Sequence, residues 1–339
     1  MSCDFDQNGA AKAGSGIFGF PYNEEISDLI LIPVPWEATC SYGGGTSKAP
    51  AQIFEASMYV ELFDSDFKDF YKKGIYCQGE DADLKALSQD TQKLAMPIID
   101  AAGILDSELS EKKECVDQAC ETMNQWVIDK TDTELVKGKK IGLIGGDHSI
   151  AFGAIKRISE GYNNLGVLQI DAHSDLRTEF ENLKYSHASV FNNVLNETSI
   201  EKLVQVGVRG YCQEEADKVN NSNGRVKTFY ESYLSEKLLS GSPWEVLCNE
   251  IIATLPHNVY ISFDIDGLDP SNCPNSGTPM PGGISYAQAI FLLRTLSQKR
   301  NIVGFDLVEV SCGKNGETSW DAIVGANLLY KLCGCILQT

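Results

Sequence analysis

Aspartates and histidines that could do chemistry gather in three short segments, each of which directly follows an apolar run. The segments are residues 145–149 (GGDHS), 171–175 (DAHSD) and 264–270 (DIDGLDP), and they hold two of the chain's four histidines. In extended backbone alternate side chains point to the same side, so Asp171, His173 and Asp175 can point one way, and Asp264 and Asp266 can do the same. Grouped and buried carboxylates are costly unless cations compensate their charge. The three segments therefore predict a metal site.

The candidate ligands are oxygen-rich, include imidazole and contain no thiolate, a set that favours Mn²⁺. They exceed what one catalytic metal with an open position takes, and they suit two metals about 3.5–4 Å apart that lower the pKa of a bridging water and supply hydroxide. Taken alone, a D-x-D pattern is commonly a loop or cap, and GGDH could be a turn with Asp147 capping a helix. The full set is His148, Asp171, His173, Asp175, Asp264 and Asp266.

The elements that must position these residues follow from apolar patterns. Near-continuous, β-branched runs predict strands that are covered on both faces, at residues 29–34, 141–144, 166–170, 203–208, 259–263 and 302–307. Helical spacing is found at residues 115–129, 244–255, 285–298 and 321–332, with Ser285 as an N-cap. This alternation predicts a parallel sheet flanked by helices, whose ligands lie at the carboxyl ends of the strands.

Composition limits the partners. The chain has 339 residues, is 43% hydrophobic and has no linker or internal repeat, which predicts one domain. A net charge of −19 argues against nucleic acid and anionic membranes, and it would suit a cationic substrate or simply keep a cytosolic protein soluble.

Cysteine usage and the N-terminus indicate the compartment. Eleven cysteines, Cys3 to Cys335, show no metal-ligand spacing and are interpreted as free thiols, including the apolar C-x-C pair Cys333 and Cys335. No signal peptide is apparent, and no apolar run approaches the length of a membrane helix. These features predict a cytoplasmic location.

The three segments together resemble the metal signature of the ureohydrolase family, the arginases and agmatinases. Residues 33–50, 203–215, 277–285 and 305–310 extend the resemblance over about residues 25 to 335. It implies a single-domain, three-layer α/β/α fold with an eight-stranded, mainly parallel sheet over residues 25–339, preceded by a flexible or partner-packed segment, residues 1–24. It also implies two Mn²⁺ per chain, with Ni²⁺ as an alternative, and assembly as a homotrimer or homohexamer.

The same resemblance implies a role for each ligand. One metal would be held by His148, Asp171, Asp175 and Asp264. The other would be held by Asp171, His173, Asp264 and Asp266, so that Asp171 and Asp264 bridge the pair. Asp175 would also orient the hydroxide.

Two further residues match the family's catalytic groups. His187 matches a mobile histidine that shuttles protons to the leaving amine, and imidazole suits that task near neutral pH. Glu309 matches the acid that pairs with the substrate guanidinium through charge-assisted hydrogen bonds. The alternatives are a core or surface histidine and a salt bridge at a strand end. His257 matches nothing and is expected in a loop.

The implied reaction splits a guanidino group into urea and an amine, with agmatine converted to putrescine, a step of polyamine metabolism, as the best match. Residues 176–186 lack the polar loop of arginases and look more like agmatinases, and Glu179 and Glu181 either face a cationic tail or are solvated. Trp36 and the sequence VSCG at residues 310–313 depart from the family's usual Phe and Asn-Pro, and Cys273 and Asn275 stand in a loop that is usually simpler.

Other substrates and other classes stay open at this point. Guanidinobutyrate, arginine and free guanidine are alternative substrates. A non-catalytic metal-binding relative is a different class, but all six ligands, His187 and Glu309 are present together. A deacetylase-like metalloenzyme is disfavoured by GGDHS and by six ligands rather than three, and metal stoichiometry would separate it from a ureohydrolase.

Overall fold

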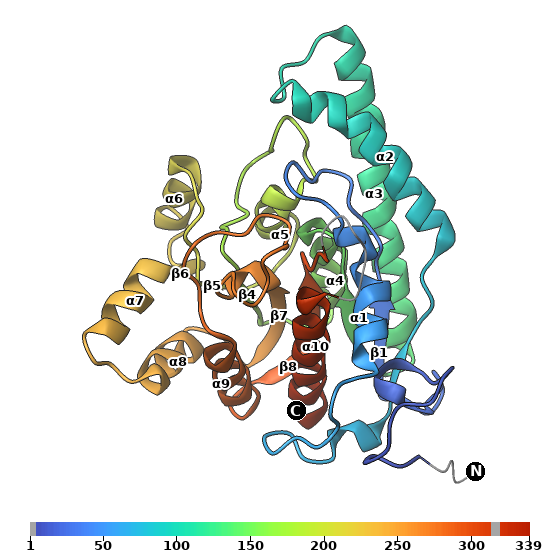
Figure 1. Ribbon diagram of the computed structural model, residues 1–339. Coiled ribbons are helices and arrows are strands. Elements are labelled where there is room, and N and C mark those ends of the chain that lie inside the picture. Colours follow the sequence, from blue (N-terminus) through green and yellow to red (C-terminus); the bar gives the residue numbers. More distant parts are fainter. Residues whose placement is uncertain (1–4, 313–318) are drawn as a thin grey trace.

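Eight strands form one sheet in which every pair is parallel, in the order β2-β1-β3-β8-β7-β4-β5-β6 (Figure 1). The computed structural model describes residues 5–312 and 319–339, so Cys3 and Gly313 lie outside the described part. The strands are β1 (Leu29–Pro33), β2 (Ile75–Cys77), β3 (Lys140–Ile144), β4 (Leu165–Ile170), β5 (Lys202–Val206), β6 (Val226–Phe229), β7 (Asn258–Asp264) and β8 (Asn301–Val308). All six predicted strands are confirmed. The two that sequence patterns missed are the edge strands β2 and β6, which are only 3 and 4 residues long.

Helices precede or follow nearly every strand. They are α1 (Ala49–Ser57), α2 (Ala82–Asp100), α3 (Ser107–Val136), α4 (Ala151–Ser159), α5 (Val190–Glu197), α6 (Gln213–Asn220), α7 (Glu231–Leu239), α8 (Trp244–Ala253), α9 (Tyr286–Ser297) and α10 (Trp320–Gln338). The four predicted helices correspond to α3, α8, α9 and α10, and the predictions for α8 and α9 extend one or two residues beyond the observed ends. Ser285 caps α9 as expected, because its hydroxyl accepts the Gln288 backbone N–H at 3.2 Å while the Gln288 side chain accepts from Ser285.

Two apolar cores lie on opposite faces of the sheet, which makes the predicted three-layer α/β/α fold. In β1, Leu29 and Leu31 belong to the core that includes residues of α1, α8, α9 and α10, whereas Ile30 and Ile32 belong to the core that includes residues of α2, α3, α4 and α5. All four side chains are fully buried. Coverage of both faces is why the inner strands are apolar without alternation.

Helix α10 corrects one expectation from the sequence. By length and composition it would suffice to cross a membrane, although no apolar run of that length was expected. In the fold 78% of its most apolar window is buried, as in a core helix of a soluble protein, and Leu328, Leu329 and Leu332 are fully covered.

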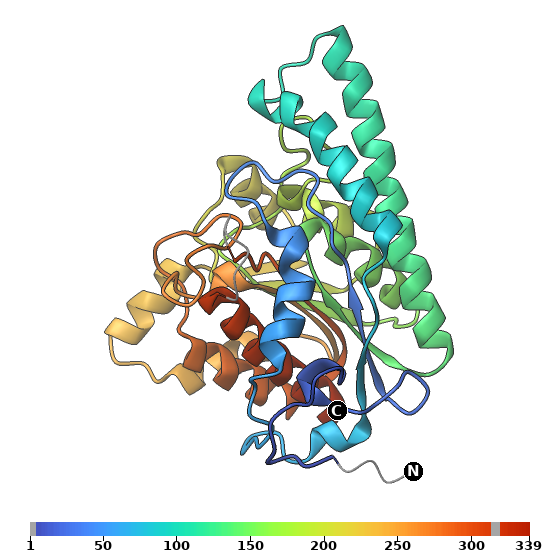
Figure 2. The same ribbon diagram turned by 45° about the vertical axis from the view of Figure 1, so that its right-hand side comes forward.

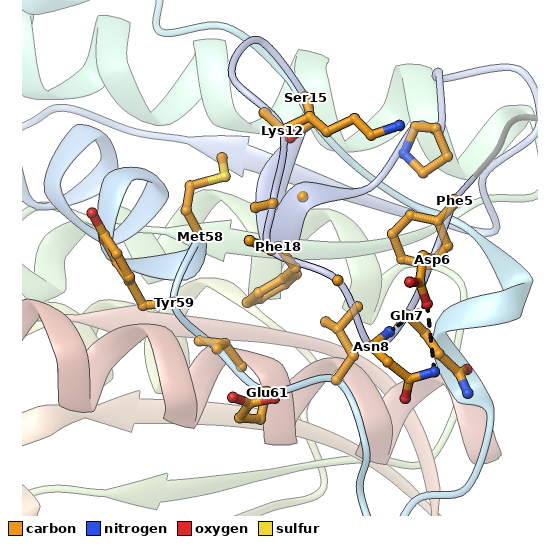
Figure 3. Close-up of a pocket in the computed structure, with 17 residues that line it drawn as sticks. Phe5, Asp6, Gln7, Asn8, Lys12, Ser15, Phe18, Met58, Tyr59 and Glu61 are labelled. Carbon is orange, nitrogen blue, oxygen red and sulfur yellow. Dashed lines mark hydrogen bonds between the residues drawn. The ribbon is translucent and has the colours of Figure 1, made fainter.

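The chain before β1 packs in part on the same core. Ile17, Phe18 and Phe20 are buried, and the Phe18 ring meets the Tyr330 ring of α10 edge-on at 5.0 Å. A cavity of about 620 Å³ lies between residues 5–21 and residues 58–62 (Figure 3). No candidate site residue lines this cavity, and the domain boundary at residue 24 stays a prediction.

The α2–α3 pair forms a long helical hairpin that extends beyond the rest of the fold (Figure 2). Asp106 starts α3 by accepting the Leu109 backbone N–H at 2.8 Å. Helix α3 is 30 residues long, twice the length of the predicted segment, and Val116, Met123 and Val127 are buried on the face that meets the core.

Candidate metal centre

The candidate residues lie at the ends of four neighbouring strands at the centre of the sheet, β3, β8, β7 and β4, or in the segments that follow these strands. His148 follows β3, Glu309 follows β8, Asp264 ends β7 and Asp171 follows β4. Because parallel strands end at one edge of the sheet, this strand order brings side chains from distant parts of the sequence together.

His148 lies at the centre of one group of carboxylates. Its Nδ1 atom is 3.0 Å from Asp171 Oδ2, 3.0 Å from Asp175 Oδ2 and 3.4 Å from Asp264 Oδ2. These four side chains are at most 6% exposed.

His173 lies at the centre of a second group. Its Nδ1 atom is 3.2 Å from Asp266 Oδ2 and 3.6 Å from Asp171 Oδ1, so each Asp171 oxygen faces a different histidine. The ligating atoms of His148, Asp171 and Asp264, and those of Asp171, His173 and Asp266, each lie within 4.8 Å of one another. Two adjacent cation positions that share Asp171 would fit this arrangement.

The backbone brings these side chains together differently from the expected extended alternation, which is wrong for two of the segments. Asp264 caps a 3₁₀ turn, η6 (Ile265–Gly267), and accepts the Asp266 backbone N–H at 2.9 Å. Asp175 has a left-handed backbone with φ of 54°. Asp264 still pairs with Val308 at the end of β7, and His173 is bridged to Gly210. Tertiary contacts fix the other positions.

The GGDH segment is both a cap and a source of ligands. Asp147 accepts the Ser149 backbone N–H at 3.0 Å and starts the 3₁₀ helix η4 (His148–Ile150). A Cβ atom on Gly146 would lie 1.9 Å from the Trp36 carbonyl oxygen, so only glycine permits this approach. The GGDH segment is therefore a capping turn through Asp147 and also contributes His148 to the cluster.

The hydrogen bonds of His148 show that its free nitrogen suits a cation. Its Nε2 atom is 2.9 Å from Ser262 Oγ, and that hydroxyl donates its only proton to Asp306 Oδ1 at 2.9 Å. The hydroxyl must then accept from Nε2–H, which leaves Nδ1 facing the carboxylates, where it would offer a lone pair to a cation once its proton is released. Nδ1 is buried and makes no hydrogen bond of its own. A buried ring nitrogen without a hydrogen-bond partner among three carboxylates fits a metal ion.

Charge in the cluster is unbalanced without cations. Burial and the neighbouring Asp266 and Asp171 raise the pKa of Asp264 well above its usual value, and burial with Asp171 raises the pKa of Asp175 to about 7. Burial alone would lower the pKa of His148, but the carboxylates of Asp171, Asp175 and Asp264 beside its ring raise it well above normal. Protons thus occupy the cluster where cations would bind, and metal binding would release them.

Glu309 is held rigidly beside the cluster. Its backbone is left-handed, with φ of 59°, and its N–H donates to the Gly146 carbonyl at 2.9 Å. Its Oε1 accepts the His148 backbone N–H at 2.9 Å. Among the described residues it forms no salt bridge, which argues against the structural alternative for this residue. Burial, with Asp147 nearby, raises its pKa well above normal.

His187 begins another 3₁₀ turn, η5 (His187–Ser189), which packs against η4. Its backbone N–H donates to Thr39 Oγ1 at 3.3 Å, and its Nδ1 lies 3.4 Å from the same hydroxyl. Burial, together with positive charge on His173 and His148, lowers its pKa to about 4. The imidazole is therefore neutral near pH 7. His257, as expected, lies in an exposed loop.

Sequence patterns missed a layer of polar residues beneath the ligands. Besides Ser262 and Asp306, Gln169 donates to Asp171 Oδ2 at 2.7 Å, and Gln205 donates to Gln169 Oε1 at 2.7 Å. All four are fully buried. Each of these polar residues stands inside an apolar run that was predicted to be a buried strand. Because a buried polar side chain needs a hydrogen-bond partner, its presence in such a run could have indicated this layer from the sequence.

An all-parallel α/β/α sheet with a paired His/Asp cluster at the ends of its central strands gives the chain a candidate centre for two adjacent cations. The model of the arginase family matches residues 27–334. The chain therefore belongs to the arginase family and is a ureohydrolase. This membership confirms the resemblance and does not favour the non-catalytic and deacetylase-like alternatives.

Relatives show how far the similarity reaches. The chain is 30% identical over 313 residues to an N(1)-aminopropylagmatine ureohydrolase of Synechocystis sp., covering 90% of this chain and 88% of that protein. It is 35% identical over 176 residues to an agmatinase of Blochmanniella floridana, covering 51% and 53%. The solved structure of proclavaminate amidino hydrolase from Streptomyces clavuligerus superposes with a TM-score of 0.74 at 21% identity, covering 97% and 99%, which shows the shared fold.

Proposed function

We propose that the chain hydrolyses agmatine to urea and putrescine. The observation that carries this proposal is Glu309, a buried carboxylate fixed by the His148 backbone N–H beside the paired cluster. A planar guanidinium can donate two parallel hydrogen bonds to a carboxylate, and a buried one makes them strong. N(1)-Aminopropylagmatine is a second candidate, because the similarity to an enzyme of that name covers nearly the whole chain.

The metals we propose are two Mn²⁺ ions, with Ni²⁺ as the alternative. His148, Asp171, Asp175 and Asp264 would hold one, and Asp171, His173, Asp264 and Asp266 the other. When bound, such a pair supplies a nucleophile from water at neutral pH and stabilises negative charge at the attacked carbon.

The protein's own groups then position substrate and move protons. Glu309 holds the guanidinium, and the rigid left-handed backbone at that residue keeps its carboxylate in place. His187 would pass a proton to the leaving amine, and the lowered pKa of its imidazole makes the protonated ring a strong donor. Asp175, whose carboxylate lies 3.0 Å from His148 Nδ1, would orient the attacking water.

The substrate's tail would meet residues 176–187. Of the two acids considered there, Glu179 is exposed, whereas Glu181 is half-buried and its Oε2 atom is buried without a hydrogen-bond partner. Burial raises the pKa of Glu181, although Arg177 opposes the shift. A positively charged tail would complete the contacts of this oxygen, which supports Glu181 rather than Glu179.

We also propose a cytoplasmic location and assembly as a homotrimer or homohexamer. The location is supported by the described cysteines, all of which are free thiols. Assembly is proposed from family resemblance. Size-exclusion chromatography with light scattering would give the mass of the assembly, and a monomer would contradict it.

Urea release from metal-loaded protein tests the proposed reaction. Mn²⁺ and Ni²⁺ forms would be assayed in parallel with agmatine, N(1)-aminopropylagmatine, guanidinobutyrate, arginine and guanidine. The highest kcat/KM with agmatine and Mn²⁺ is expected. Preference for another compound would overturn the substrate assignment, and absence of urea from all five, with two ions bound, would overturn the function.

A further inference from the structure

The loop between Asp175 and His187 contains a strained turn. Phe180 and Leu183 exchange two backbone hydrogen bonds, at 3.2 and 2.9 Å. The residues between them, Glu181 and Asn182, have φ of 55° and 61°. These features define a type I′ turn, which favours Asn and Gly at its centre. Glutamate is unfavourable there, so the turn needs support from outside.

The tip of the α2–α3 hairpin, residues 101–106, supplies that support. The Asn182 side chain donates to the Gly103 carbonyl at 2.5 Å. Gly103 has φ of +76°, and a Cβ atom there would lie 2.7 Å from the Glu181 carbonyl carbon. Two backbones therefore meet directly, as the approach of the loop to the hairpin in Figure 1 also shows. The Lys184 backbone N–H donates to Asp117 of α3 at 3.3 Å.

The supported turn continues into the catalytic face of the site. The Phe180 ring meets the His187 ring edge-on at 5.9 Å, and the Arg177 guanidinium lies 4.9 Å from the centre of the Phe180 ring. His187 in turn opens η5, which packs against η4 and its residue His148. A continuous set of contacts thus joins the hairpin tip to the metal centre.

We propose that the α2–α3 hairpin tip positions the substrate-facing loop. Gly103 and Asn182 act as positioning residues: they hold the 180–183 turn, which sets Phe180 against His187 and Glu181 toward the substrate's tail. The tail contact rests on the proposed function, whereas the mechanical support of the loop does not. The hairpin projects from the fold because its tip must reach this loop.

The test compares two glycines at opposite ends of α3. Gly103→Ala would push the tip away from Glu181, whereas Gly138→Ala has the same type of backbone, with φ of +75°, and meets nothing within 4 Å. Asn182→Gly is a second variant that keeps the turn conformation and removes the side-chain hydrogen bond. Each protein would be loaded with Mn²⁺ and checked by calorimetry for two bound ions.

Gly103→Ala and Asn182→Gly should raise the KM for the wild-type enzyme's best substrate about tenfold, which corresponds to about one hydrogen bond, with kcat within about threefold. Hydrogen–deuterium exchange of residues 178–187 should rise in both, and neither change should occur in Gly138→Ala. Unchanged exchange would overturn the supporting contact, and raised exchange with unchanged KM would overturn its positioning role. If the wild type releases no urea, the proposed function fails, but exchange still decides whether the hairpin supports the loop.

Discussion

Replacing Ser262 by alanine should weaken metal binding without removing any candidate ligand. The hydroxyl accepts from His148 Nε2 and donates to Asp306, with both contacts at 2.9 Å. Alanine would leave the His148 N–H without its partner, and Asp306 would lose the donor to Oδ1 while its Oδ2 already has no hydrogen bond. The imidazole would then lose the contact that fixes its tautomer and ring orientation.

The expected size follows from similar supporting contacts in metal sites, where losing one weakens metal affinity about 10–100-fold, or about 1.4–2.7 kcal/mol. The effect should be concentrated at the ion held by His148, because His173 has its own contacts. The assay is calorimetric titration of metal-stripped protein with Mn²⁺, which resolves two sites when their affinities differ.

Ser57→Ala is the matched control. Ser57 is fully buried, its hydroxyl accepts the Phe18 N–H at 3.0 Å and donates to the Phe54 carbonyl at 2.7 Å, and it lies at the end of α1 rather than at the cluster. It should lower stability by about 1–3 kcal/mol and leave both Mn²⁺ affinities unchanged. Wild-type Mn²⁺ affinity at both sites in Ser262→Ala would refute the orienting role.

Three further changes test other parts of the site. Burial raises the pKa of Asp306 to about 6, so between about pH 4 and pH 6 the native carboxyl holds a proton that the unfolded chain has released, and the stability of the fold falls as pH rises through this range. Metal-free Asp306→Asn should lack this loss and should gain up to about 3 kcal/mol in the free energy of unfolding relative to wild type at pH 7, measured by chemical denaturation. A pH dependence parallel to that of wild type would contradict the assignment. Gly277→Ala would place a Cβ atom 2.0 Å from Glu309 Oε2 and would displace this carboxylate. The variant should therefore lose at least about tenfold in kcat/KM while it still binds both ions. A wild-type kcat/KM would argue against substrate binding by Glu309. His187→Ala should lower kcat about 100-fold with unchanged Mn²⁺ binding and partial rescue by added imidazole, and a wild-type kcat would exclude proton transfer by this residue.

The inner sheet was predictable because strands covered on both faces carry an unmistakable apolar signal. The sequence did not predict the edge strands β2 and β6, because each is too short to form a recognisable run of apolar residues. Helix α3 was predicted over only half its length, because its first residues, 107–114 (SELSEKKE), and its last residues, 130–136 (KTDTELV), are mostly polar and show no apolar periodicity. Its course at residues 107–114 is set by the loop it supports, which local sequence does not encode.

The metal cluster was predictable as a set of residues but not as a geometry. Ligand types and spacing selected six side chains that the fold brings together, and their role as metal ligands stays a prediction, whereas the left-handed backbones of Asp175 and Glu309 depend on contacts made by distant segments. For Glu309 these contacts come from Gly146 and His148, more than 150 residues away in the chain. The buried Ser262 and Asp306 were overlooked because an apolar run was interpreted only as a strand.

The unequal exposure of the two histidines has a consequence for how the enzyme acquires and loses its metals. His148 is 1% exposed, whereas the side chain of His173 is 25% exposed, so the second cation position lies on the solvent side of the first. An ion bound at His148 would have to arrive before the outer position fills, or wait for that position to empty. Loading would then be ordered in time, and a chelator would first produce a half-loaded protein, with the outer ion gone and the inner one retained.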